Sequence, residues 1–266
     1  MPVVIDWRQV INDGYPLPSG AAREAALAEL SEALRSPDPV LRDERALDVA
    51  TRWIPDLDSG ARRRLGDEMA ARLADGEIQA RTFAALILAV VVEQGEFEPS
   101  WLAAFGRWYP AETDLRGHDP DLGWLHAVAH GADLLGTFGR SPAADPAPLL
   151  DLAAARLLAP TGYVFAAAED DRLGFAIGLT LTRAELTRAQ ATGWLDPVAA
   201  ALGATEPGPP PAEISNTVRT LRVLYLLADR GVRPDWADGD PMPLAHRDAV
   251  RERLAEVLAL MAPFTG

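Results

Sequence analysis

The sequence predicts an all-α protein, and three observations support this. Apolar residues recur at three- and four-residue spacing through most of the 266 residues, which is the period of an amphipathic helix. The alternation of Val, Ile, Thr and aromatic residues that is typical of strands is hard to find. Helical segments begin about 20 residues apart, so that a pair occupies about 40 residues, the length of a HEAT repeat. We therefore expect a HEAT-like α-α superhelix, or helical array, with a compact helical bundle as the alternative.

Each expected helix begins after a break in the apolar pattern. The breaks are rich in Gly, Pro, Asp and Ser and cover residues 14–20, 75–76, 141–148, 205–211 and 236–243. Several starts carry capping residues, such as Asp58 or Ser59 at the third helix and Pro99-Ser100 before Trp101 at the fifth. In chain order, we expect helices over residues 20–34, 38–54, 58–74, 79–93, 99–108, 121–138, 145–158, 169–182, 183–202 with a possible break at Gly193, 213–230 and 243–261.

We expect one domain over residues 1–266. The Pro-rich residues 206–212 are the only plausible linker, and the stretch that follows them, about 55 residues, is small for an independent domain. No repeated sequence motif accompanies the helix starts, so the expected array rests on segment lengths.

The composition excludes several partners and mechanisms. The 39 acidic residues outnumber the 25 basic residues, which are all Arg, and the net charge of −14 would repel nucleic acid and anionic bilayers. A local Arg pocket could still hold one anion, because a guanidinium binds an oxyanion in bidentate fashion. The absence of Lys and Cys excludes a Schiff base, a thiol nucleophile and disulfides. The longest apolar run, residues 83–92, is too short to span a bilayer, and we expect a cytoplasmic protein.

Residues 119–135 contain the most informative polar pattern. Two of the four histidines, His126 and His130, lie there with Asp133 among small and apolar residues. On a helix, His130 lies roughly 40° from His126 and Asp133 about 20° away on its other side, so that all three share one face. A buried polar group without a partner is costly, and we therefore expect this face to be the centre of function.

The stretch 123–133, Gly-Trp-Leu-His-Ala-Val-Ala-His-Gly-Ala-Asp, resembles the signature of a bacterial family, the domain of unknown function 2785 (DUF2785). Further stretches that are similar to the family pattern are residues 41–44, 52–54, 114–117, 169–173 and 217–225. The resemblance covers most of the chain. It implies an all-helical, HEAT-like protein of the bacterial cytoplasm, and it carries no assigned activity.

Three interpretations of the His segment remain open. Histidines at i and i+4 can hold a divalent metal, but the third ligand would have to come from another segment. The candidates for that ligand are Asp43, Glu44, His118, Glu169, Asp170 and Asp171. Alternatively, Asp133 orients His130 and favours its protonated form in a dyad for acid–base catalysis or ligand binding. In the third interpretation, both histidines are core residues whose nitrogens bind carbonyls or carboxylates of neighbouring helices.

Four arginines, Arg116, Arg172, Arg219 and Arg222, allow two interpretations. Arg219 and Arg222 lie three apart on one expected helix and could present guanidinium groups to an anion. Because acidic residues are in excess, we favour pairing of these arginines with Asp43, Glu44 or the acidic residues 169–171.

The sequence leads to a hypothesis of a binding or interaction protein with one polar pocket for a small polar ligand or a protein partner. The residues expected in this pocket are His126, His130 and Asp133, with Trp124 as a wall and some of Asp43, Glu44, Arg116, Glu169 and Arg222. The alternative is a metal-dependent or His-assisted hydrolase or lyase acting on a small polar substrate. Its candidate catalytic residues are His126, His130 and Asp133, and His126 and His130 would bind the metal.

Overall fold

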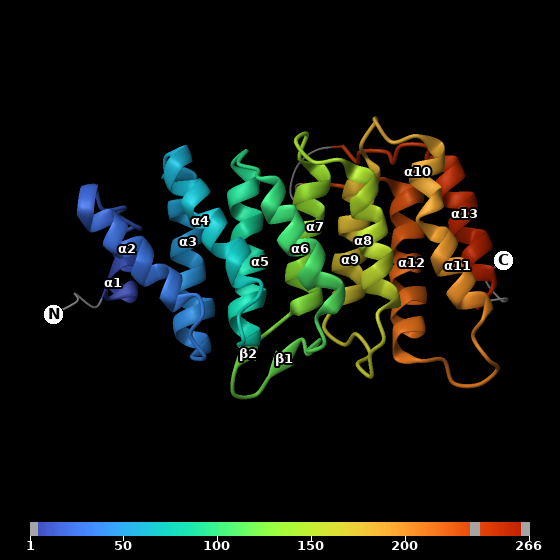
Figure 1. Ribbon diagram of the computed structural model, residues 1–266, viewed down its shortest axis with the longest axis horizontal. Helices are drawn as coiled ribbons and strands as arrows, with labels where there is room; N and C mark the ends of the chain where they lie inside the picture. The colour runs from blue at the N-terminus through green and yellow to red at the C-terminus, as the bar shows by residue number, and fades with distance from the viewer. Residues whose placement is uncertain (1–4, 235–239, 262–266) are drawn as a thin grey trace.

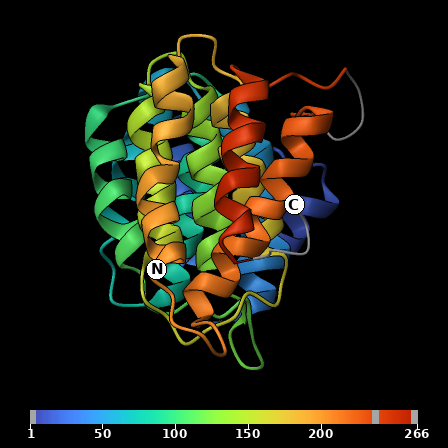
Figure 2. The same ribbon diagram turned by 90° about the vertical axis from the view of Figure 1, so that its right-hand side faces the viewer.

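The computed structural model describes residues 5–234 and 240–261 (Figure 1). Its helices stand side by side along the longest axis, with the N-terminal helices at one end and the C-terminal helices at the other. Figure 2 shows the same helices from the C-terminal end, where α11 and α13 face the viewer. The prediction of a mostly helical protein is therefore confirmed for these residues.

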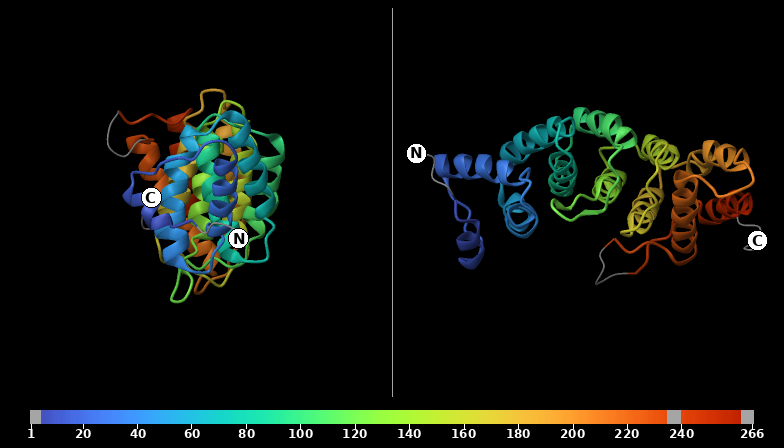
Figure 3. Two further views of the ribbon diagram at one scale, coloured as in Figure 1. Left: turned by 90° about the vertical axis from the view of Figure 1, so that its left-hand side faces the viewer. Right: turned by 90° about the horizontal axis from the view of Figure 1, so that it is seen from below.

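The helices form two layers, which are seen most clearly from below (Figure 3). The outer layer follows the outside of a shallow arc and contains α2 (Gly20–Ala33), α4 (Ser59–Arg72), α6 (Pro99–Trp108), α8 (Pro146–Leu158) and α11 (Leu195–Gly203). The inner layer contains α3 (Leu47–Trp53), α5 (Ile78–Glu93), α7 (Ala127–Arg140), α9 (Glu169–Leu181) and α12 (Ala212–Arg230). Within the inner layer, α7 packs between α5 and α9, and α9 packs against α12.

The remaining elements are short or terminal. They are α1 (Trp7–Asn12), the 3₁₀ turns η2 (Ile54–Asp56) and η3 (Tyr109–Ala111), α10 (Arg188–Gly193) and α13 (Arg247–Ala259). Side-chain caps begin several helices, because they satisfy amides that lack a partner in the first turn. The Asp58 carboxylate accepts from the amide of Ala61, and Thr187 and Gln190 form a capping box at α10.

Two of the expected helices are divided in the structure, and one short helix was not expected. The expected helix 38–54 begins as a π-helix, η1 (Val40–Ala46), and continues as α3. The expected helix 183–202 is divided into α10 and α11, with the break next to Gly193 as predicted. A helix at α1 was not expected, since its six residues are too few to show a period.

The expected helix 121–138 begins only at Ala127. The residues before it form a two-stranded antiparallel hairpin, β1 (His118–Asp119) and β2 (Gly123–Trp124), in which His118 pairs with Trp124. The Asp119 side chain accepts hydrogen bonds from two turn amides, and Gly123 has a φ of +73°, which is unfavourable for other residues. Turn chemistry therefore overrides helix propensity at this point.

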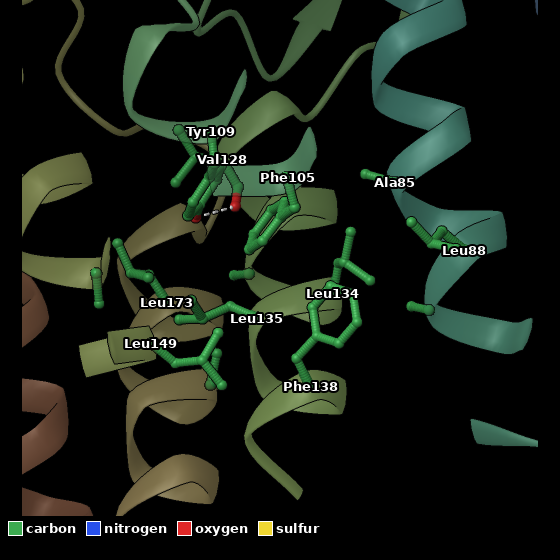
Figure 4. Packing of buried hydrophobic residues seen from close by; sticks show 14 of the residues in the cluster. Ala85, Leu88, Phe105, Tyr109, Val128, Leu134, Leu135, Phe138, Leu149 and Leu173 are labelled. Carbon is green, nitrogen blue, oxygen red and sulfur yellow. Dashed lines mark hydrogen bonds between the residues drawn. The ribbon is translucent and has the colours of Figure 1, made fainter. Parts of the chain in front are cut away.

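The core runs between the layers through most of the described chain. Around α7 it contains Phe105, Leu134, Phe138 and Leu173, and the Tyr109 hydroxyl donates to the Val128 carbonyl at 2.8 Å (Figure 4). Within the described residues, no helix combines the length and the apolar character needed to cross a bilayer.

Candidate functional site

His126 lies at the N-terminal end of α7 and adopts the left-handed conformation, with φ 48° and ψ 40°. Its amide and that of Leu125 donate to the Gly117 carbonyl at the base of the hairpin. The prediction that His126 belongs to the same helical row as His130 is therefore wrong in its geometry. The two side chains are neighbours nevertheless, because their ring centroids lie 5.6 Å apart.

Five rings form a continuous row from the surface to the core, which we call the ring row: His118, Trp124, His126, His130 and Phe83. Trp124 stacks on His126 with centroids 4.4 Å apart and planes at 4°, and its other contact is His118 at 4.9 Å. At the inner end, Phe83 meets His130 edge-on at 5.2 Å. The exposed fraction falls from 47% for Trp124 to 7% for His130.

Burial favours the neutral form of both inner histidines. Burial lowers the pKa of His130 to about 3. Burial also lowers the pKa of His126, while the nearby Glu169 carboxylate opposes that shift. The Nδ1 atoms of both rings are buried and have no hydrogen-bond partner in the described part of the chain. His130 is thus a core residue and His126 is half-buried, and the hydrogen bonding of both rings is incomplete.

The proposed dyad between His130 and Asp133 is not formed. Asp133 instead binds Arg172 of α9: Nε donates to Oδ1 at 2.9 Å, and Nη2 donates to Oδ2. The pKa of His130 is lowered, so Asp133 does not favour a protonated imidazole there. The dyad failed as a prediction because spacing along one helix says nothing of an arginine 39 residues away in sequence.

Two other predicted residues flank the ring row. The Asp43 carboxylate lies 2.7 Å from Arg42 Nε, and a hydrogen bond from the Trp124 backbone links it to the hairpin. Glu169 is fully buried at the start of α9, and its carboxylate accepts from the Ala167 amide at 2.7 Å and from the Tyr163 hydroxyl. Burial raises the pKa of Asp43, and Arg42 opposes this shift.

The other predicted residues do not join this cluster. Glu44 and Arg222 are exposed. Arg116 is exposed and pairs with Asp114 and Asp119 on its own loop. Arg219 pairs with Asp170 at 2.7 Å, which confirms for this arginine the expected pairing with the acidic residues 169–171.

The described residues contain no group of three His, Asp or Glu side chains that could hold a metal ion. The metal interpretation required a third ligand beside His126 and His130. Within residues 5–234 and 240–261, none of the candidates named for that role completes such a group.

Space for a ligand lies beside the Asp133–Arg172 pair rather than at the histidines. None of the five principal cavities around the described residues is lined by His126 or His130. Asp133 and Arg172 line a cavity of about 280 Å³ between α5, α7 and α9. We call this the small inner cavity, since only inner-layer helices and Pro234 form it.

A larger cavity of about 760 Å³ adjoins it and shares Arg172 and Phe175 with it. We call it the arginine cavity. Its lining residues come from α9, from α12 and from the segment after α12: Asp171, Arg172, Phe175, Val223, Leu227, Arg230, Gly231, Arg233 and Pro241. Most of these were not singled out from the sequence, where Arg230 is indistinguishable from any arginine that ends a helix.

The fold and these cavities define a two-layered helical protein with space for a small molecule on its inner layer. Residues 69–226 match the model of the family described as Protein of unknown function (DUF2785). Because the match covers more than half of the chain, the protein belongs to the DUF2785 family, as the resemblance predicted. No curated protein and no solved structure matches the chain.

Proposed function

We propose that this protein is a HEAT-like helical array that binds a small organic anion with an apolar body in the arginine cavity. The proposal keeps the hypothesis of a binding protein. It places the ligand at Arg172, the partner of Asp133, rather than at the histidines. The remaining parts of the hypothesis, one domain over residues 1–266 and a cytoplasmic location, belong to the same proposal.

The size of the arginine cavity supports a small molecule as the ligand. Sites for cofactors and small ligands usually measure about 300–1,000 Å³ and are mostly apolar, with a few polar groups that fix orientation. The arginine cavity measures about 760 Å³, and Phe175, Val223 and Leu227 contribute apolar side chains to it. These side chains suit a hydrocarbon chain or a ring.

The charge of the lining supports an anion, and this observation carries the proposal. Among the described lining residues, three guanidinium groups, from Arg172, Arg230 and Arg233, accompany one carboxylate, from Asp171. Arg172 is already bound by Asp133, whereas Arg230 and Arg233 have no hydrogen-bond or ion-pair partner within the described residues. The chain as a whole has a net charge of −14, so this excess of positive charge is confined to the surroundings of the cavity. Guanidinium groups bind carboxylates and phosphates in bidentate fashion.

Calorimetric titration of the full chain with octanoate tests the proposal. We expect octanoate to bind and octanol, which lacks the charge, to bind at least about tenfold more weakly. The double variant Arg230→Gln, Arg233→Gln should weaken octanoate binding by a similar factor, since both charges lie at the cavity. Both side chains are exposed, so the fold should be unaffected.

Arg222→Gln is the matched control. Arg222 is exposed on the same helix as Arg230 but does not line the cavity. We expect this variant to bind octanoate like the wild type. An equal loss in the control and the double variant would mean that net charge, rather than the cavity, controls binding, and would overturn the proposal. So would the absence of octanoate binding.

A further inference from the structure

A second large cavity lies at the opposite end of the array, away from the arginine cavity. It measures about 790 Å³ and is formed where α1, α2, η1 and the start of α5 meet. We call it the N-terminal cavity. Its lining includes Trp7, Glu29, Glu32, Leu41, Glu77 and Gln79.

Gln79 gives the first indication of a ligand. Its side chain lies in the lining of the cavity and is only 3% exposed. The amide nitrogen donates to the Arg35 carbonyl at 3.4 Å, but the amide oxygen, Oε1, is buried and accepts no hydrogen bond within the described residues. A buried acceptor without a donor is unfavourable, and few such groups occur in native proteins. A ligand with an N–H group in this cavity would supply the missing donor.

The backbone gives a second, independent indication. Leu41 and Arg45 of the lining belong to η1, a seven-residue π-helix. The π-helical geometry is rare, and it occurs frequently at functional sites, where it alters the direction of side chains. The side chains of η1 point in two directions. Leu41 and Arg45 line the cavity, while Arg42 and Asp43 contact each other and the hairpin.

The charge of the lining decides what kind of donor fits. Four carboxylates line the cavity, those of Asp6, Glu29, Glu32 and Glu77, against the two guanidinium groups of Arg35 and Arg45. Arg35 is already neutralised, because it pairs with Asp75 at 2.9 Å and with Glu32 at 3.7 Å. With Arg35 and Glu32 set aside as partners, Asp6, Glu29 and Glu77 remain in the described lining against Arg45. This excess of carboxylates favours a donor that carries positive charge.

We propose that the N-terminal cavity binds a small organic cation that carries N–H donors, such as an arylamidinium or a primary ammonium with an apolar body. One N–H of the cation donates to Gln79 Oε1, and the carboxylates balance its charge. Trp7 and Leu41 contact the apolar part. This site is independent of the arginine cavity, which carries the opposite charge and shares no lining residue with it.

The test uses benzamidinium as the probe, titrated into the full chain by calorimetry. Benzoate has the same shape and the opposite charge, and benzyltrimethylammonium has the charge without any N–H. We expect benzamidinium to bind and each of the other two to bind at least about tenfold more weakly. Failure of benzamidinium to bind, or equal binding of the cation without N–H groups, would overturn the proposal.

Two substitutions at Gln79 separate the hydrogen bond from packing. Gln79→Met keeps the length of the side chain and removes the acceptor, and we expect it to weaken benzamidinium binding about tenfold. Gln79→Glu restores an acceptor, with a charge, and should bind at least as tightly as the wild type. Unchanged binding by Gln79→Met contradicts the proposal.

Should Gln79→Met fail to fold, exposed carboxylates supply the test. Glu77→Gln removes a carboxylate of the lining and should weaken benzamidinium binding several-fold. Glu24→Gln is the matched control, because Glu24 is exposed on α2 and does not line the cavity. Equal effects of these two variants would overturn the proposal. We expect neither variant to alter octanoate binding, because neither residue lines the arginine cavity.

Discussion

Arg172 of α9 and Asp133 of α7 form a bidentate ion pair that joins two neighbouring helices of the inner layer. The pair lines the small inner cavity, and Arg172 also reaches the arginine cavity. It thus links the α7–α9 helix pair to the space in which we propose that a ligand binds. Asp133, which the sequence suggested as a functional residue, therefore lines one of the two adjoining cavities.

Arg172→Met should reduce the free energy of unfolding by about 1–2 kcal/mol, because it leaves the Asp133 carboxylate without its partner. The moderate value reflects exposure, since the Arg172 side chain is 39% exposed and that of Asp133 is 27% exposed. Urea unfolding followed by circular dichroism measures the loss. Asp133→Asn and the double variant complete a cycle, and a coupling free energy of zero would show that the pair contributes nothing to stability.

Acid should destabilise the protein through His130. Its pKa is about 3 in the folded chain, below the ordinary value of 6.5, so the unfolded chain takes up this proton first as the pH falls. Stability should therefore decline as the pH falls from about 6.5 toward about 3, by about 1.4 kcal/mol per pH unit for one proton. Burial also lowers the pKa of His126, which adds in the same direction.

The variant His130→Leu checks the assignment of this pH dependence. It removes the titrating group while keeping an apolar side chain against Phe83. Urea unfolding at several values between about pH 5 and pH 7 should give a shallower slope for the variant than for the wild type. Parallel slopes would mean that His130 titrates alike in the folded and unfolded chains.

Gly131→Ala should destabilise the fold, although alanine favours helix. A Cβ at this position would lie 2.1 Å from Cε2 of Tyr109, which is fully packed in the core, and relieving the clash should cost about 1–3 kcal/mol. Gly106 of α6 is the control, because a Cβ there meets nothing within 4 Å. Gly106→Ala should instead raise the melting temperature, by the equivalent of up to about 1 kcal/mol. Similar shifts in both variants would contradict the packing of α7 on η3.

The helices of this protein could be predicted from its sequence, because their apolar periods and breaks are local properties. Asp58 marks the start of α4, and Gly193 marks the division between α10 and α11, as expected. The hairpin before α7 could not be predicted in this way. Its strands have only two residues each, and its form depends on Asp119 and Gly123 in the turn.

The candidate site was predictable only in part. The spacing of His126 and His130 correctly suggested neighbouring rings, although the left-handed backbone of His126 was not foreseen. Contacts between distant segments were missed, because periodicity carries no information on which helices pack together. Arg172 therefore appeared only as one of several arginines, and Phe175 was not singled out, yet both line the two adjoining cavities.

The crystal structure of the protein with octanoate brominated at its terminal carbon tests the central claim most directly. Anomalous scattering locates the bromine without ambiguity. We predict a peak among Phe175, Val223 and Leu227, with the carboxylate within hydrogen-bond distance of Arg230 or Arg233. A bound molecule whose bromine lies outside the arginine cavity, or crystals that contain no ordered bromine at a saturating concentration, would contradict the account.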